Sequence, residues 1–261
     1  DFFPNVTASG LHGQATVFIR HNGNTSQAAI PVPSSGDGRD IYIRLPNAVS
    51  PAPTRLDLAF VIDVTGSMGD ELAYVHHEVA GIVERVRAAV PQVVVRVAAT
   101  FYRDRGDPIP IEQIPFSSDI ASFTAQMRYV QASGGGDYPE DMNMGLAASL
   151  TTLDWTETQA VRVVVLIADA PPQAYPDFQF THHHAMNEAS RRGVRILPVA
   201  ASGSDRSVEY LFRAFGAFTS TPYVYLTNDS GLGSHDMEAD TDRIAVEMFS
   251  DILTRPIIAD L

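Results

Sequence analysis

The chain contains no cysteine and no lysine. Its 261 residues include 18 basic residues, and all of them are arginine. The missing cysteine excludes disulfide bonds, thiolate nucleophiles and thiolate metal sites. The missing lysine excludes a P-loop lysine, Schiff-base chemistry and a Ser-Lys catalytic dyad. We prefer to interpret the missing lysine as the mark of a GC-rich bacterial genome.

Long apolar runs and positive charge are also scarce. No run of about 20 apolar residues exists, so we expect no membrane insertion. The formal net charge of −13 argues against nucleic acids and anionic membrane surfaces as partners, because both need a basic face. The 45% hydrophobic content supports a real core. The length suits one large domain, or one domain with an appendage.

The most informative stretch begins at Asp63. The apolar run before it, residues 56–62, is typical of a strand buried on both faces. Two hydroxyls follow the carboxylate at alternate positions, Thr65 and Ser67, with Gly66 between them to allow a tight turn. Such a set of hard oxygens suits Mg²⁺ or Ca²⁺ and does not suit zinc. An amphipathic segment follows, so these oxygens lie at the carboxyl end of a strand, where open α/β sheets bind ligands.

Two further sets of residues extend this pattern. Residues 134–140 (GGGDYPE) form a glycine loop that opens a helix, and residues 163–171 (VVVLIADAP) form a second buried strand that ends in Asp169. In order and spacing the three sets resemble the von Willebrand factor A domain and its metal-ion-dependent adhesion site, over residues 55–255. Asp137 stands in the second loop where many members have Thr. With this aspartate, the loop is more similar to the A domains of the integrin β-subunit and of bacterial and hemicentin-like proteins than to those of the integrin α-subunit.

The resemblance implies a set of site residues. Asp63, Thr65 and Ser67 would hold the ion, while Asp137 and Asp169 would complete its shell directly or through water. Mg²⁺ is the expected ion, with Ca²⁺ or Mn²⁺ as alternatives. Three directly bound aspartates would outweigh the charge of the ion and repel an acidic ligand. At least one of Asp137 and Asp169 should therefore act through water.

Other readings of these residues stay open. Asp63 could simply end a strand, with Thr65 and Ser67 capping the next helix. Asp137 could serve near a helix start, where a carboxylate meets a favourable dipole. Asp104 resembles the Tyr-Arg-Asp loop of related A domains, but a salt bridge with Arg103 or Arg105 is an equally simple role. Three further residues could shape the loops or hold the direct ligands in place without binding the ion themselves: Gly66, Asp104 and Gly136.

We expect three parts along the chain. Residues 1–54 hold short β-like runs separated by turn clusters, and should form a small β-rich appendage and linker. Residues 55–255 alternate buried strands with amphipathic helices, which predicts a doubly wound, mostly parallel α/β sheet. Residues 256–261 form a tail that could add a strand to the appendage. The periodicity predicts helices at 70–90, 120–127, 139–153, 185–192 and 240–254, and further strands at 93–101, 194–200 and 223–226.

These features predict a binding module and not an enzyme. In it, a bound divalent cation would bridge to an acidic residue of a protein ligand, as in cell adhesion. One alternative is a cytosolic A domain that partners an AAA+ ATPase in an assembly or chelatase-type system. A metal-dependent hydrolase is the third reading, although Ser67 lacks an obvious His base nearby. We expect an extracytoplasmic location, meaning secreted, periplasmic or at the cell surface, with the cytoplasm as the alternative.

Overall fold

The computed structural model describes residues 13–21, 24–32, 52–136, 138–226, 249–259 and 261. The chain divides into two compact units. The first contains a hairpin in which β1 (Gly13–His21) pairs antiparallel with β2 (Asn24–Val32). These strands contain two of the three β-like runs that the sequence shows in this region, at residues 15–20 and 28–32. The third, at residues 40–45, lies outside the described residues.

The second unit is built on a six-stranded sheet in the order β5-β4-β3-β6-β7-β8. Five strands are parallel to their neighbours, and only β5 at one edge runs antiparallel. This confirms the predicted doubly wound, mostly parallel fold. The strand bounds are β3 (Arg55–Asp63), β4 (Val94–Tyr102), β5 (Ile111–Ser117), β6 (Ala160–Ala168), β7 (Val194–Ala200) and β8 (Val224–Tyr225).

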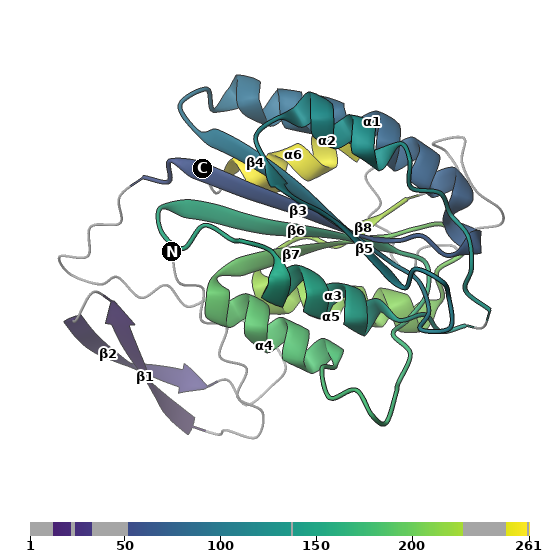
Figure 1. The fold of residues 1–261 in the computed structure, drawn as a ribbon. Coiled ribbons are helices and arrows are strands. Elements are labelled where there is room, and N and C mark those ends of the chain that lie inside the picture. Colours follow the sequence, from purple (N-terminus) through teal and green to yellow (C-terminus); the bar gives the residue numbers. More distant parts are fainter. Residues whose placement is uncertain (1–12, 22–23, 33–51, 137, 227–248, 260) are drawn as a thin grey trace. The chain divides into compact units, whose positions relative to one another are not determined.

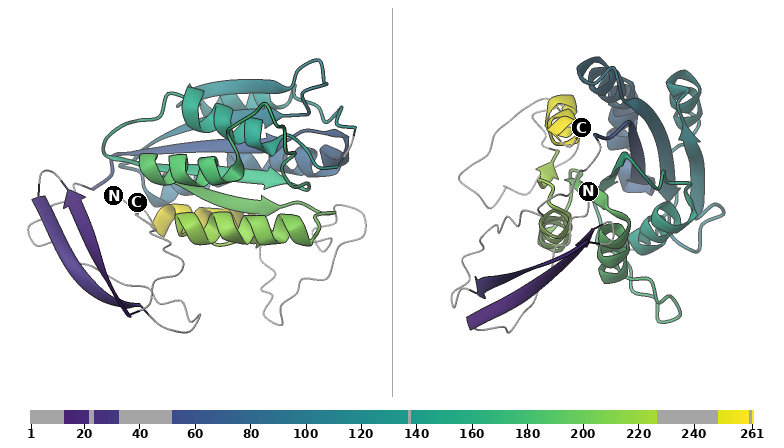
Figure 2. Two further views of the ribbon diagram at one scale, coloured as in Figure 1. Left: turned by 90° about the horizontal axis from the view of Figure 1, so that it is seen from below. Right: turned by 90° about the vertical axis from the view of Figure 1, so that its left-hand side faces the viewer.

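Helices cover both faces of this sheet (Figure 1). One face packs against α1 (Gly69–Ala89), α2 (Ile120–Met127) and α6 (Phe249–Ala259). The other packs against α3 (Met142–Thr152), α4 (His182–Arg192) and α5 (Arg206–Thr219). The right-hand view of Figure 2, which looks along the strands, shows α6 on the same side of the sheet as α1.

The alternation of side chains along β3 explains why two cores form. Leu58, Phe60 and Ile62 point into the core beneath α1, α2 and α6, while Ala59 and Val61 point into the core above α3, α4 and α5. Because successive side chains of a strand face opposite sides, a strand buried on both faces must be apolar throughout. Asp63, the last residue of β3, therefore lies at the carboxyl end of the sheet, between the ends of β4 and β6.

Three predicted elements need correction. We placed Pro139 in the first turn of the third helix, but α3 begins at Met142 and is capped by the Asp141 side chain, which accepts a hydrogen bond from Met144 N. We expected the closing helix to end near residue 254 and the tail to be a strand. Instead, α6 continues through Pro256 to Ala259, and Leu253 and Ile257 pack into the core.

The sequence reading also passed over α5. Its buried stripe, Val208, Leu211, Phe212 and Phe215, follows helical spacing, and Asp205 caps its first turn. The edge strand β5 was missed as well, because it is short and only partly buried.

A partly buried ion pair joins β3 to β4 at the end opposite Asp63. The Arg96 guanidinium donates two hydrogen bonds to Asp57, at 2.8 and 2.7 Å, and Thr156 N donates a third at 2.6 Å. Asp57 is fully buried. Since removing one partner leaves the other charge buried and uncompensated, Asp57→Ala should lower the free energy of unfolding by about 3–5 kcal/mol.

Urea denaturation measures this loss. The matched control is Arg85→Ala, which breaks the exposed pair with Asp251 and should cost no more than about 1 kcal/mol. Equal losses for the two variants would show that the Asp57 pair contributes no more than a surface contact.

Candidate functional site

Three loops meet at the carboxyl ends of the central strands. The first follows β3, and main-chain hydrogen bonds tie it to the second: Ser133 N donates to Val64 O at 2.9 Å, and Gly66 N donates to Gly134 O at 3.1 Å. The second is tied in turn to the third, because Glu140 N donates to Pro171 O at 3.1 Å. These bonds involve the backbone alone, so they fix the loops before any side chain is considered.

The first loop brings together the predicted oxygen ligands. Asp63 Oδ1 accepts hydrogen bonds from Thr65 N at 2.9 Å and from Thr65 Oγ1 at 2.8 Å. Ser67 Oγ lies 3.4 Å from Thr65 Oγ1. Asp63 and Thr65 are buried, while Ser67 and Gly66 are exposed, so the set opens to solvent on the Ser67 side. The second oxygen of the Asp63 carboxylate, Oδ2, is buried and forms no hydrogen bond of normal geometry, although the Tyr102 side chain lies beside the carboxylate.

Two more carboxylates lie around Asp63. Asp169, after β6, is buried, and its side chain interacts with the Ser67 hydroxyl. Glu140, from the second loop, is buried and lies against Asp104 from the loop after β4. Asp169 Oδ1 and Glu140 Oε2, like Asp63 Oδ2, are buried without a hydrogen-bond partner. Buried polar atoms are normally paired, and a bound cation would fit a cluster of three such carboxylate oxygens.

The electrostatics lead to the same conclusion. Burial raises the pKa of Asp63 to about 7, and the nearby charge of Asp169 adds to the rise. The pKa of Glu140 is raised to about 8. Burial is the largest cause, and the charges of Asp63 and Asp104 add to it. Burial also raises the pKa of Asp169, although the Ser67 hydroxyl opposes that change. In each case the environment favours the neutral acid over the carboxylate.

The two arginines that flank Asp104 in the sequence are engaged elsewhere. Arg103 donates to three backbone carbonyls, those of Ile109, Gln131 and Ser133. Arg105 pairs with Asp141 and Asp177. Among the described residues, no ion pair involves Asp63, Glu140 or Asp169.

The structure can be compared with the predicted site residue by residue. It brings Asp63, Thr65, Ser67 and Asp169 together, with Gly66 in the loop that joins them. Asp104 is buried beside Glu140, as a supporting residue would be. Gly136 is exposed, and a Cβ there would meet nothing within 4 Å, so packing does not require a glycine at this position. Asp137 lies outside the described residues.

Glu140 is the main site residue that the sequence reading missed. It stands in the quoted glycine loop, but placing the start of the helix at Pro139 hid its role. Recognising Asp141 as the helix cap would have left Glu140 in the loop, free to point at the site. Asp107 was also missed: its Oδ2 accepts hydrogen bonds from Gly135 N at 2.9 Å and from Asp104 N at 3.2 Å, which joins two loops.

The second loop needs glycine where it passes closest to the site. Gly135 has a positive φ of 71°, and a Cβ there would lie 2.8 Å from Glu140 Oε1 and 3.1 Å from Thr65 Cβ. A side chain at this position would therefore strain the backbone and crowd two site residues at once.

The donor set fits a hard cation with retained waters. No three His, Asp or Glu side chains within the described ranges are arranged to hold a metal ion between them. A shell of one direct carboxylate, two hydroxyls and water does not need such a trio, and it is typical of Mg²⁺. The more distant carboxylates would then hold the water ligands.

Comparison with known proteins agrees with this topology. The family profile of the von Willebrand factor A domain matches residues 57–213. This chain belongs to that family. Its A domain contains all three loops described above, and A domains are in general protein-interaction modules that often bind a divalent metal.

Two relatives match this chain over 117 and 97 residues. An ariadne-like RING finger protein of Acanthamoeba polyphaga mimivirus is 33% identical over 117 residues, which make up 45% of this chain and 11% of that protein. Hemicentin-2 of Mus musculus is 35% identical over 97 residues, or 37% of this chain and 2% of hemicentin-2. This chain therefore spans only a small part of the relatives it matches.

Among solved structures, the pilus adhesin SpaC from Lactobacillus rhamnosus GG is similar. It has a TM-score of 0.49 and 15% identity, over 68% of this chain and 28% of SpaC.

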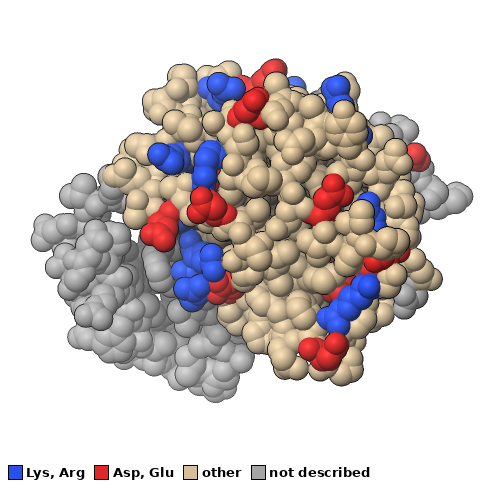
Figure 3. Space-filling model, in the orientation of Figure 1, with Lys and Arg blue, Asp and Glu red and all other residues tan. Residues whose placement is uncertain are grey.

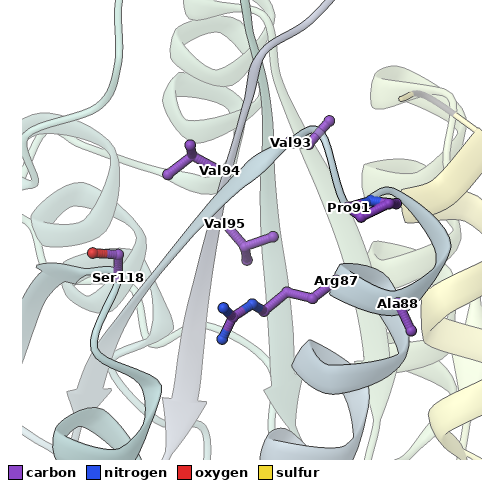
Figure 4. A pocket seen from close by; sticks show the side chains of 7 residues that line it. All are labelled: Arg87, Ala88, Pro91, Val93, Val94, Val95 and Ser118. Carbon is purple, nitrogen blue, oxygen red and sulfur yellow. The ribbon is translucent and has the colours of Figure 1, made fainter.

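One hollow on the described part of the A domain lies away from the predicted site. A hollow of about 480 Å³ lies at the opposite end of the sheet, where β4 begins and α1 ends (Figure 4). None of the predicted site residues lines it; its walls are Arg87, Ala88, Pro91, Val93, Val94, Val95 and Ser118. On the face shown in Figure 3, basic and acidic side chains of the described residues are interspersed. No helix in the described ranges is long and apolar enough to cross a membrane.

The raised pKa values predict how pH affects the metal-free A domain. Because the folded-state pKa of Asp63 lies above its ordinary 3.8, the folded protein binds more protons than the unfolded chain between about pH 4 and 7. Stability should therefore fall as the pH rises through this window. With EDTA present, the melting temperature should fall from pH 5 to pH 8 by on the order of 5 °C more in the wild type than in Asp63→Asn.

The variant separates this contribution from those of His76 and His182, whose lowered pKa values act in the opposite direction. Differential scanning fluorimetry at several pH values makes the comparison. If the melting temperatures of the two proteins changed with pH in parallel, the raised pKa of Asp63 would be refuted.

Proposed function

We propose that this A domain binds a protein ligand through a divalent cation, with Mg²⁺ as the native ion. Asp63, Thr65 and Ser67 hold the ion through one carboxylate and two hydroxyl oxygens. Asp169 and Glu140 contact it through water or complete its shell, and Asp137 is assigned to the same group from the sequence pattern. A bound cation would supply the positive charge that this cluster lacks.

The observation that carries the proposal is the set of orphaned oxygens. Asp63, Glu140 and Asp169 each bury a carboxylate oxygen that accepts no hydrogen bond, and the described residues supply no ion pair to any of the three. Burying such groups without compensation costs several kcal/mol. A bound cation would remove that cost and would also explain why the hydroxyls of Thr65 and Ser67 lie only 3.4 Å apart beside Asp63.

The exposed side of the cluster suits a ligand. Ser67 and Gly66 reach the surface while Asp63 lies beneath them. One coordination position would remain open toward solvent, and a Glu or Asp side chain of the partner would fill it. The ion can attract an acidic ligand only if the carboxylates bound directly to it do not cancel its charge. At least one of the carboxylates should therefore contact the ion through water. An extracytoplasmic location remains a prediction from the sequence.

Metal addition tests the assignment of Asp63. An ion that binds only the folded state stabilises it by about 2.7 kcal/mol at a concentration 100 times Kd, which corresponds to a rise in melting temperature of roughly 5–10 °C. Mg²⁺ or Mn²⁺ should produce this rise in the wild type and not in Asp63→Asn. In EDTA the variant should melt no lower than the wild type, because Asn Oδ1 can still accept both hydrogen bonds from Thr65.

Asp251→Ala serves as the control, since it removes an exposed carboxylate on α6 far from Asp63 along the sequence. An equal rise in wild type and Asp63→Asn would refute the assignment. A large drop of the variant in EDTA would instead show that Asp63 has a purely structural role.

The glycine loop offers a second, sterically matched test. Gly135→Ala should weaken Mg²⁺ binding at least about tenfold, because its Cβ would push against Glu140 and Thr65 in a backbone conformation that costs about 1–2 kcal/mol for an L-residue. Gly136→Ala changes the next residue, where the space is open, and should leave the affinity within about twofold. Titration calorimetry with Mg²⁺ measures both. Similar affinities for the two variants would show that Glu140 and Thr65 do not shape the ion site.

A further inference from the structure

Tyr138 is an exposed aromatic residue at the rim of the site. Its side chain is 51% exposed, although it stands only two residues before the buried Glu140. The segment it belongs to is fixed beside the third loop, since Glu140 N donates to Pro171 O and Gln173 N donates to Glu140 O at 2.7 Å. The ring therefore lies on the surface where the second and third loops meet.

The position of the ring is constrained by its hydroxyl. Tyr138 interacts through the hydroxyl with the Asp205 carboxylate. Asp205 is itself held at the start of α5, where its Oδ1 accepts hydrogen bonds from Ser207 N at 2.8 Å and Val208 N at 3.1 Å. Tyr138 thus lies beside Asp205 and stays half exposed, and a tyrosine ring offers apolar surface at a low cost in conformational entropy because it has only two side-chain torsions.

The ring also lies close to the ion site. Burial, the contact with Asp205 and the charge of Asp169 together raise the pKa of Tyr138, so Asp169 lies within electrostatic range of its hydroxyl. Other exposed tyrosines lack this setting: Tyr129 follows the end of α2, and Tyr210 stands on the outer face of α5. Tyrosine is enriched among the few interface residues that contribute most of the binding energy.

We infer that Tyr138 is a specificity-determining residue, which selects ligands whose acidic residue is flanked by an apolar side chain. The cation binds the ligand carboxylate, and the Tyr138 ring packs against the neighbouring side chain of the ligand. This inference rests on the proposed cation bridge.

Two acetylated and amidated peptides test it: Gly-Gly-Glu-Gly-Gly and Gly-Leu-Glu-Leu-Gly. Their affinities for the full chain are measured by NMR titration, in Mg²⁺ and in EDTA. Wild type should bind the leucine peptide on the order of tenfold more tightly in Mg²⁺. Tyr138→Ala should lose this preference while it binds the glycine peptide as before, and Tyr138→Phe should retain part of it. Tyr210→Ala, which removes a still more exposed tyrosine elsewhere, should match the wild type.

The outcomes separate the two proposals. Metal-dependent binding of both peptides with equal affinity would overturn the role of Tyr138 and leave the cation bridge standing. If Tyr138→Ala weakened the binding of both peptides equally, the role of Tyr138 would also be overturned. The ring would then stabilise the site without selecting between ligands. If neither peptide binds in a metal-dependent way, the cation bridge is refuted, and the inference about Tyr138 is refuted with it.

Discussion

The rest of the site depends on one constraint, which is the burial of several carboxylates at the end of the central strand. Asp63 is fully buried there, and Glu140 and Asp169 lie near it with oxygens that accept no hydrogen bond. Such a cluster is stable only when it is protonated or when it holds a cation. The raised pKa values of Asp63 and Glu140 describe the first state, and the proposed Mg²⁺ describes the second.

The fold supplies the rigidity that this arrangement requires. β3 is apolar on both faces and ends at Asp63, so two cores fix the position of that carboxylate. Main-chain hydrogen bonds then join the first loop to the second and the second to the third. Because the like charges are held together by the backbone, the cluster cannot relax by moving apart. The stability of the fold is thereby used to maintain a site that would otherwise be unfavourable.

Much of the fold, and the positions of Asp63 and Asp169 in it, could be predicted from the sequence. Long apolar runs that end in Asp63 and Asp169 locate the central strands, and parallel strands bring their ends to one edge. The role of Glu140 could not be predicted in the same way, since it depends on whether Pro139 or Asp141 begins α3. The loop contacts of Asp107 depend on chain segments far apart in sequence. The helical spacing in α5 was a usable signal that was passed over, while the extent of α6 depends on packing against α1, which no local pattern reveals.

The most direct test of the central claim is crystallography of the protein soaked with Mn²⁺, which replaces Mg²⁺ and scatters anomalously. The account predicts an anomalous peak about 2–2.3 Å from an oxygen of Asp63 and from the hydroxyls of Thr65 and Ser67. It also predicts that Thr65 Oγ1 no longer donates to Asp63 Oδ1. A well-occupied peak elsewhere, or none at all with the bond from Thr65 to Asp63 intact, would contradict it.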